Sequence, residues 1–236
     1  MSSKSRVVIV AGGEGGERTA RYAAELERIL EPLCQPEIFT GADAFKHLGR
    51  CRLLILLGQH DIQTLGDQHQ PLTYAHKQCF GGYVSSGRPI VVVGAAIRSF
   101  SEWPRFAELI GFQLEKPPAN QSFSDKHTLA LHDEEHPIIQ GVQHVPGTAL
   151  WTGIPVPTGG VEMTVVASTW YDSAHIPVVA IGEGGARPGA GPSCYLALRD
   201  APETLQDPTL RSLWRNTVTW ALEEGHSASL AGAEKQ

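Results

Sequence analysis

Short, fully apolar runs that each end in a glycine turn are the feature of this sequence that most restricts its fold. Residues 7–11, 53–57 and 90–93 are such runs, rich in Val, Ile and Leu. A strand that is apolar on both faces has to be covered on both sides, which is typical of a parallel sheet between two helical layers. The sequence therefore predicts an α/β fold with a mostly parallel sheet and helices on both faces.

Helical segments separate these runs. Apolar stripes at helical spacing predict helices over residues 17–30 and 74–86 and a short helix over 103–110, and residues 36–40 are a further predicted strand. Strand and helix therefore alternate as far as Gly111, as in α/β proteins.

The second half of the chain has a different pattern. Prolines and glycines are frequent between residues 112 and 192, and short β-like pieces occur at 128–132, 161–168 and 178–181. These pieces predict extra β elements, either as added strands or as an inserted β-layer, and residues 193–198 are the last predicted strand.

A final helix starts with a strong signal. Asp207 is a good N-cap and Pro208 suits the first helical position, so the helix is predicted to run from there to Gly225. The small, polar residues 226–236 are predicted to be a disordered tail. No long linker interrupts residues 1–225, which are predicted to form one domain.

Charge and hydropathy exclude several partners. The net charge is -6, with 19 Lys+Arg against 25 Asp+Glu, and there is no basic stripe, so nucleic acid is not an expected partner. The apolar runs are far shorter than the ~20 residues of a membrane span. The N-terminus has no secretory signal, so we expect a cytoplasmic protein that does not bind membranes. The oligomeric state stays open, a homo-oligomer included.

The four cysteines have no metal or redox spacing. Cys34, Cys51, Cys79 and Cys194 form no CxxC pair, which predicts buried, reduced thiols. We expect no cofactor and no bound metal.

Loops at the carboxyl ends of the predicted strands hold the candidate site. In an open parallel sheet ligands bind beyond these ends, so the loops should meet at one cleft. Their polar residues are Glu14, Gln59, His60, Asp61, Arg98, Arg199 and Asp200. Carboxylates and an imidazole suit acid/base chemistry, and arginines suit binding of an oxyanion.

Two of these loops resemble known catalytic or binding turns without matching them. The glycines at 12–16 fit neither GxGxxG nor a P-loop, so a tight strand-to-helix turn is expected, with Gly13 as a candidate contact for substrate. Gly94-Ala95-Ala96 stands where a nucleophile elbow would be, but it lacks Ser or Cys. Covalent catalysis from this turn is therefore not expected.

Other candidates lie in the second half. Residues 132–136 spell the zinc pattern HxxEH, but Pro137 and the strand-like preceding residues argue against the helix that this pattern needs. A polar loop is expected there. Trp151 and Trp170 are candidate walls for a ligand, whereas Trp214 is expected to pack in the core.

Several short pieces together resemble the ThuA-like (trehalose-utilisation) family, whose fold is that of class I glutamine amidotransferases. The match extends over roughly residues 6–223. The pieces that carry it are Tyr83, Val84 and Gly87 leading into 90–94, Trp103-Pro104, Leu109-Ile110-Gly111, His136-Pro137-Ile138 with Gly141, 193–198, Asn216 and Trp220-Ala221.

This resemblance implies a flavodoxin-like, doubly wound sheet and a role in carbohydrate metabolism, with oxidised (keto) sugars as a plausible substrate class. It also adds His136 to the candidate residues for substrate binding. Family members usually have histidines after the first strand and at the elbow, where this chain has glycines and Gly94-Ala95.

Two functions follow from these observations. One is an enzyme that acts on a sugar-like small molecule by non-covalent acid/base chemistry, with Glu14, His60 or Asp61 moving protons. In that enzyme Gln59, Arg98, His136, Arg199 and Asp200 would bind the substrate. The other is a non-catalytic ligand-binding or assembly module on the same fold. True amidotransferase activity is not expected without a cysteine at the elbow.

Overall fold

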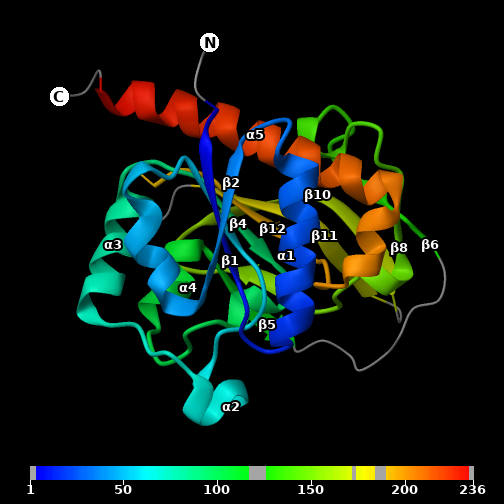
Figure 1. The fold of residues 1–236 in the computed structure, drawn as a ribbon. Coiled ribbons are helices and arrows are strands. Elements are labelled where there is room, and N and C mark those ends of the chain that lie inside the picture. Colours follow the sequence, from blue (N-terminus) through cyan, green and yellow to red (C-terminus); the bar gives the residue numbers. More distant parts are fainter. Residues whose placement is uncertain (1–3, 117–125, 172–173, 184–189, 234–236) are drawn as a thin grey trace.

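A central sheet of eight strands organises the molecule (Figure 1). The computed structural model describes residues 4–116, 126–171, 174–183 and 190–233. In chain order the strands of this sheet are β1 (Arg6–Ala11), β2 (Gln35–Thr40), β3 (Leu53–Leu56), β4 (Ile90–Val93), β7 (Ala130–Leu131), β10 (Glu162–Tyr171), β11 (Ala174–Glu183) and β12 (Ser193–Leu196). Their spatial order is β2-β1-β3-β4-β12-β11-β10-β7.

The parallel part of the sheet confirms the predicted α/β fold. Strands β2, β1, β3, β4 and β12 run parallel to their neighbours. Strands β11, β10 and β7 continue the same sheet in antiparallel pairing. The long β pieces of the second half are therefore added strands of the main sheet.

Two short strand pairs lie outside the main sheet. Strand β5 (Phe112–Lys116) pairs with β9 (Ile154–Pro157), and β6 (Lys126–Thr128) pairs with β8 (His144–Pro146). The sequence left two alternatives for the second half, added strands of the main sheet or an inserted β-layer. Strands β10 and β11 are added strands of the main sheet, whereas the pairs β5–β9 and β6–β8 lie outside it.

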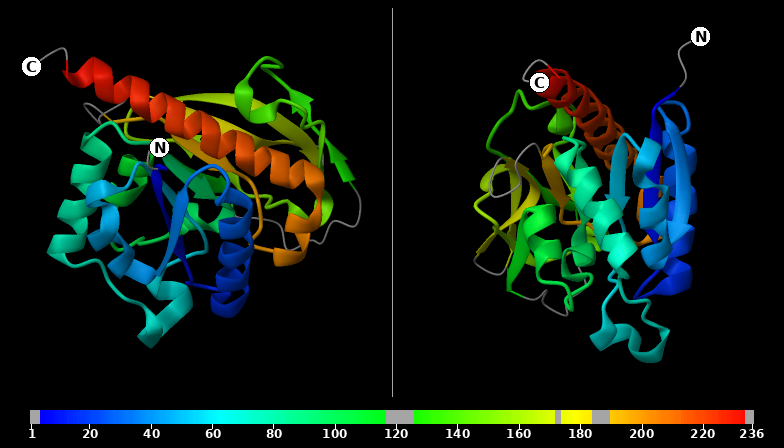
Figure 2. Two further views of the ribbon diagram at one scale, coloured as in Figure 1. Left: turned by 45° about the horizontal axis from the view of Figure 1, so that its top comes forward. Right: turned by 90° about the vertical axis from the view of Figure 1, so that its left-hand side faces the viewer.

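Each face of the sheet has its own apolar core, and Figure 2 shows helices on both sides of the sheet. On one face α1 (Gly16–Leu30) and α5 (Pro208–Ala233) cover the sheet; on the other lie α3 (Tyr74–Ser85), α4 (Arg105–Ile110) and the 3-10 segment η1 (Gly41–Arg50). Because side chains alternate along a strand, Val7 and Ile9 face the first core while Val8 and Val10 face the second. This alternation explains why the strands are apolar throughout.

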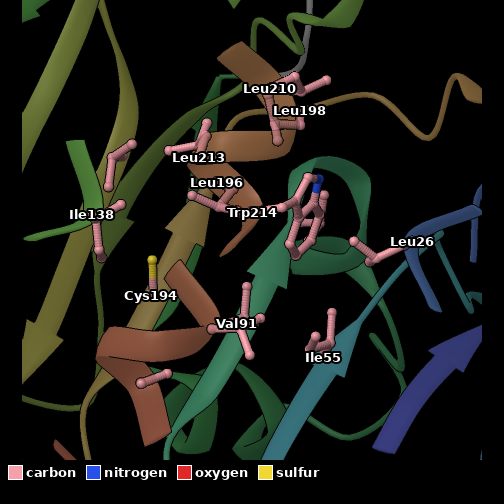
Figure 3. Packing of buried hydrophobic residues seen from close by; sticks show 14 of the residues in the cluster. Leu26, Ile55, Val91, Ile138, Cys194, Leu196, Leu198, Leu210, Leu213 and Trp214 are labelled. Carbon is pink, nitrogen blue, oxygen red and sulfur yellow. The ribbon is translucent and has the colours of Figure 1, made fainter. Parts of the chain in front are cut away.

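Trp214 is the largest fully buried side chain of the first core. Figure 3 shows its ring on α5 among Leu26 of α1 and the strand residues Ile55 and Val91. Its Nε1–H donates a hydrogen bond of 2.8 Å to the hydroxyl of Tyr22. The core role predicted for Trp214 is confirmed.

Helix α5 begins where the sequence predicts. Asp207 Oδ1 accepts hydrogen bonds from the backbone N–H groups of Thr209 at 2.8 Å and Leu210 at 3.3 Å. These two donors would otherwise have no partner within the helix. Asp207 is therefore the N-cap.

Asp207→Ala is expected to lower the free energy of unfolding by ~1 kcal/mol, because the capping acceptor is lost. Urea denaturation of the two proteins measures the difference. Asp207→Asn keeps a side-chain oxygen at the cap, so its free energy of unfolding should stay within a few tenths of a kcal/mol of the wild-type value. Equal stability of the alanine variant and wild type would place the start of the helix elsewhere.

The end of α5 corrects the sequence prediction. The helix does not stop at Gly225 but continues to Ala233. The disordered tail from residue 226 stays a prediction. Gly225 has a packing role: a Cβ built on it would lie 2.5 Å from Cδ of Pro89, the residue just before β4. Close approach of the helix to Pro89, and not helix termination, requires glycine here.

Gly225→Ala is expected to destabilise the protein, although alanine normally stabilises a helix interior by about 1 kcal/mol relative to glycine. The rigid Pro89 ring cannot move aside as a flexible side chain would. The matched control is Gly82→Ala in α3, where a Cβ would meet nothing within 4 Å. Opposite shifts of the melting temperature in the two variants are the expected result, and stabilisation of both would contradict it.

No helix in the described part of the chain is long and apolar enough to cross a membrane.

Candidate functional site

A cavity of about 580 Å³ lies where the loops after β1, β3, β4 and β12 meet. We call it the large cavity. Its polar lining residues are Glu14, Arg18, Gln59, Arg98, Arg199 and Asp200, and Val93, Ala95, Trp151 and Leu198 are among its apolar ones. The structure thus brings five of the seven predicted loop residues to one cavity: Glu14, Gln59, Arg98, Arg199 and Asp200. Their roles in binding or catalysis stay predictions.

Glycines let these loops approach one another closely. Gly58 has φ +72, and a Cβ built on it would lie 2.1 Å from the carbonyl oxygen of Gly12. Beside this contact the backbone N–H of Glu14 donates to the carbonyl of Gln59 at 2.8 Å. The glycine loop at 12–16 is therefore a tight turn held against the β3 loop, as the sequence predicts.

The charged residues of the large cavity differ in how firmly they are held. Asp200 accepts hydrogen bonds from the hydroxyl of Thr19 and from Arg18 Nη2, the latter at 3.1 Å. Arg199 Nε donates to the carbonyl of Leu150 at 2.7 Å. Both side chains are thus partly committed to contacts within the protein.

Besides Arg18, which pairs with Asp200, Glu14 and Arg98 are the exposed charges of this cavity. Neither forms an ion pair with another residue in the described ranges. Their charged groups are therefore available to a ligand.

Trp151 provides an apolar wall. Only 8% of the residue is exposed, and its ring packs edge-on to Tyr195 with centroids 6.4 Å apart. A Cβ on Gly153 would lie 2.0 Å from the Trp151 ring, so glycine is needed for this packing. The hypothesis that Trp151 lines a ligand site agrees with its place in the cavity. Trp170 is 58% exposed and lines neither described cavity.

The elbow after β4 carries no nucleophile. Ala95 lines the large cavity at this turn, and Gly94 has φ +45. Cys194 lies in the first core, where burial raises the pKa of its thiol well above the ordinary value. Neither position offers a thiolate to a ligand.

His60 and Asp61 do not join the large cavity, which corrects the expectation that all seven loop residues meet there. His60 is 6% exposed and its ring stacks on Phe100 at 5.7 Å between centroids. Its backbone is held by the Ser99 hydroxyl at 3.0 Å and by the N–H of Phe100 at 2.7 Å. His60 and Gly13 line a second, smaller cavity. Asp61 is buried and lines neither cavity.

His136 also lies apart from the large cavity. It precedes the short 3-10 segment η4 (Pro137–Ile139), and its Nδ1 accepts the N–H of Ile138 at 3.3 Å. Its ring packs against Trp220 at 5.7 Å between centroids. This geometry gives His136 a capping role, and the structure does not bring it to the predicted substrate site.

The HxxEH segment is a turn and not a helix, as the proline predicts. His132 Nε2 lies 2.8 Å from the hydroxyl of Ser168. Within the described residues no group of three His, Cys, Asp or Glu is arranged to hold a metal ion.

Cys79 corrects the expectation of four buried cysteines. Cys34, Cys51 and Cys194 are buried, but Cys79 is exposed on α3. The helical period places position 79 on the outer side of α3, next to the buried Phe80.

The buried imidazole of His60 makes stability depend on pH. Burial lowers the pKa of His60 from 6.5 to about 4. Because the folded pKa is the lower one, the unfolded chain binds a proton first, and stability is lost as the pH falls from 6.5 toward 4. Between pH 7.5 and 4.5 this group should cost about 2–3 kcal/mol. Urea denaturation of wild type and His60→Phe at both pH values measures it; equal losses in the two proteins would contradict the assignment to His60.

Comparison with known proteins places this geometry in context. Residues 7–221 match the ThuA family, described as "Trehalose utilisation". A comparison with curated individual proteins finds no match.

Solved structures share the fold. A ThuA-like protein from Bacteroides uniformis has TM-score 0.68 and 17% identity, covering 93% of this chain and 92% of that one. A ThuA-like protein from Parabacteroides merdae has TM-score 0.69 and 14% identity, covering 94% and 90%. A GMP synthase protein from Thermoplasma acidophilum has TM-score 0.56 and 16% identity, covering 100% of both chains. At these identities the likeness concerns the fold alone, and it agrees with the amidotransferase-like fold that the family resemblance implies.

Proposed function

Because the chain belongs to the ThuA family, we propose that its large cavity binds a sugar-like ligand and that the protein acts in carbohydrate metabolism. The observation that carries this proposal is the combination of the Trp151 wall with Gln59, Arg98 and Glu14 around one cavity. A sugar has apolar ring faces that pack on an aromatic ring and hydroxyl edges that need hydrogen-bonding partners. The cavity offers both.

The proposed chemistry is proton transfer on an oxidised (keto) sugar. The carbonyl of such a sugar acidifies the neighbouring C–H, so that a carboxylate can remove the proton and an arginine can stabilise the resulting enediolate. Glu14 is the proposed base, and Arg98 the proposed partner of the oxyanion. No covalent intermediate is proposed, since Ala95 stands at the elbow.

The second candidate is a non-catalytic binding module. It is favoured by the commitment of Asp200 and Arg199 to internal contacts, and by the position of His60 and Asp61 outside the large cavity. Under this candidate the cavity still binds a sugar-like molecule, but no bond is made or broken.

Binding is tested by thermal shift over sugars and keto-sugars, followed by calorimetry on any that raise the melting temperature, because a ligand of the native state stabilises it. Trp151→Leu should weaken binding at least tenfold. Trp170→Leu is the matched control, since this exposed tryptophan lines neither cavity, and it should bind as wild type. No shift with any member of the panel, or equal loss in both variants, would reject the site.

The proposed compartment is the cytoplasm. Three buried, unpaired cysteines fit a reducing environment. A protein of Salmonella typhimurium with TM-score 0.57 and 14% identity is described as cytoplasmic.

A further inference from the structure

The charged side chains of the large cavity come from loops at different places along the sheet. Arg98 follows β4 and Arg199 follows β12, and these two strands are neighbours. Their loops are in close contact, since a Cβ built on Gly94 would lie 2.1 Å from the carbonyl oxygen of Leu198. Glu14 follows β1, and β3 lies between β1 and β4. We call the adjacent loops after β4 and β12 the arginine side of the cavity.

The carboxylate nearest in sequence to the arginine side, that of Asp200, already has a partner. One of its oxygens accepts a hydrogen bond from Arg18 Nη2 at 3.1 Å, and the other accepts one from the hydroxyl of Thr19. Both donors belong to α1, so the carboxylate of Asp200 is directed toward that helix. Within the described ranges it forms no ion pair with Arg98.

Arg98 is exposed at the end of the 3-10 segment η3 (Gly94–Arg98), on a backbone that buried neighbours hold in place. Ile97 and Ser99, on either side of it, are 4% and 5% exposed. The hydroxyl of Ser99 also accepts a hydrogen bond from the backbone N–H of His60 at 3.0 Å. In the part of the chain that the structure describes, the Arg98 guanidinium has no ion-pair partner. Its N–H donors are therefore available at a fixed place in the cavity wall.

We propose that the ligand of the large cavity is a sugar that carries an anionic group, a carboxylate or a phosphate, and that Arg98 binds this group. The inference rests on the sugar site proposed above and specifies its ligand. A guanidinium binds the oxygens of a carboxylate or phosphate through two parallel N–H···O bonds, which a neutral hydroxyl cannot match. Trp151 adjoins the same loop, since a Cβ on Gly94 would lie 3.3 Å from its Cγ. A sugar ring packed on Trp151 is thus next to the segment that carries Arg98.

The sign of the charge in the cavity agrees with an anionic ligand. Among the described residues that line it, the charged ones are three arginines and two carboxylates, whereas the whole chain has a net charge of -6. The cavity therefore has the opposite sign to the protein as a whole, and it attracts anions more than it attracts neutral sugars. Glu14 does not pair with Arg98 in the described structure, so it can keep its proposed role as the base.

The experiment compares ligands of similar shape and different charge. Calorimetry on the full chain at low salt measures the affinity for glucuronate and for its neutral amide, glucuronamide. A second pair is glucose 6-phosphate and glucose. At least one acid should bind about tenfold or more tightly than its neutral counterpart, which is the contribution of a charge-assisted pair. The acid with the larger preference identifies the anionic group as carboxylate or phosphate. Raising the salt concentration to about 0.5 M should weaken binding of that acid and leave binding of the neutral sugars unchanged.

Variants localise the anionic group. Arg98→Gln removes the positive charge, so most of the preference for the acid should be lost while the weaker binding of its neutral counterpart remains. The matched control is Arg105→Gln, at an exposed arginine of α4 that lines neither cavity. This control should bind all four ligands as wild type does. The wild-type comparison of acid and neutral sugar decides even without the variants.

The outcomes separate this inference from the proposed sugar site. Equal affinity for each acid and its neutral counterpart would overturn the anionic ligand and leave the sugar site intact. Inorganic phosphate that binds as tightly as the preferred acid would indicate an anion site without sugar recognition, and would overturn both. A preference for the acid that Arg98→Gln does not reduce would place the anionic group elsewhere. No binding of either acid would also overturn the inference, and the wider panel of sugars and keto-sugars then decides the sugar site by itself.

Discussion

Trp214→Ala is expected to lower the free energy of unfolding by about 3–5 kcal/mol. The side chain is fully buried between α1, α5 and the sheet, so its removal leaves a cavity that the rigid neighbouring strands cannot fill. The change also leaves the buried hydroxyl of Tyr22 without its donor, the Trp214 Nε1–H at 2.8 Å. Equilibrium denaturation in urea measures the loss.

Two variants separate the causes of this loss. Trp214→Phe keeps most of the apolar contact but removes the hydrogen bond to Tyr22. Its free energy of unfolding should therefore lie between those of wild type and the alanine variant. Trp170→Ala, at a tryptophan that is 58% exposed, should change stability by less than about 0.5 kcal/mol. A loss below about 1 kcal/mol for Trp214→Ala would show that α5 does not depend on this contact.

If the proposed proton transfer occurs, Glu14→Gln is expected to reduce turnover of the proposed keto-sugar substrate by about 10²–10⁴-fold, the usual contribution of a positioned general base. Glutamine keeps the shape and hydrogen-bonding capacity of the side chain but cannot accept the proton. Substrate binding, measured by calorimetry, should change far less than kcat, because the Trp151 wall and Arg98 remain.

The matched control is Glu17→Gln, an exposed carboxylate in the first turn of α1 that does not line the large cavity. It should leave both kcat and binding unchanged. Unchanged turnover in Glu14→Gln would remove Glu14 as the base. A protein that binds sugars without turning over any of them would favour the non-catalytic candidate.

Local sequence patterns were sufficient for the parallel strands and the longer helices, but they did not show the short strands β5, β6, β8 and β9. The continuous apolar runs at β1, β3 and β4 follow directly from burial on both faces. The Asp207-Pro208 start of α5 depends on hydrogen bonds within three residues, which a pattern can show. The prediction that the last helix ends at Gly225 was wrong, because glycine is needed there for close packing against Pro89, which is far away in the chain.

For the candidate site, too, the sequence predicted some features and tertiary packing decided others. The rule that ligands bind beyond the carboxyl ends of parallel strands was enough to bring Glu14, Arg98 and Asp200 to one cavity. It could not show that neighbouring residues of one loop face different cavities, as Gln59 and His60 do. Likewise, His136 matched a family pattern, yet its ring caps η4 beside Trp220.

The sequence by itself determined the α/β layering, the parallel core of the sheet and the absence of a nucleophile at the elbow, because these follow from hydropathy period and residue type. Only the tertiary structure decided which polar side chains share a cavity. The direction of a loop side chain depends on packing against distant segments, such as the Ser99-Phe100 backbone that holds His60, and no local pattern contains that contact.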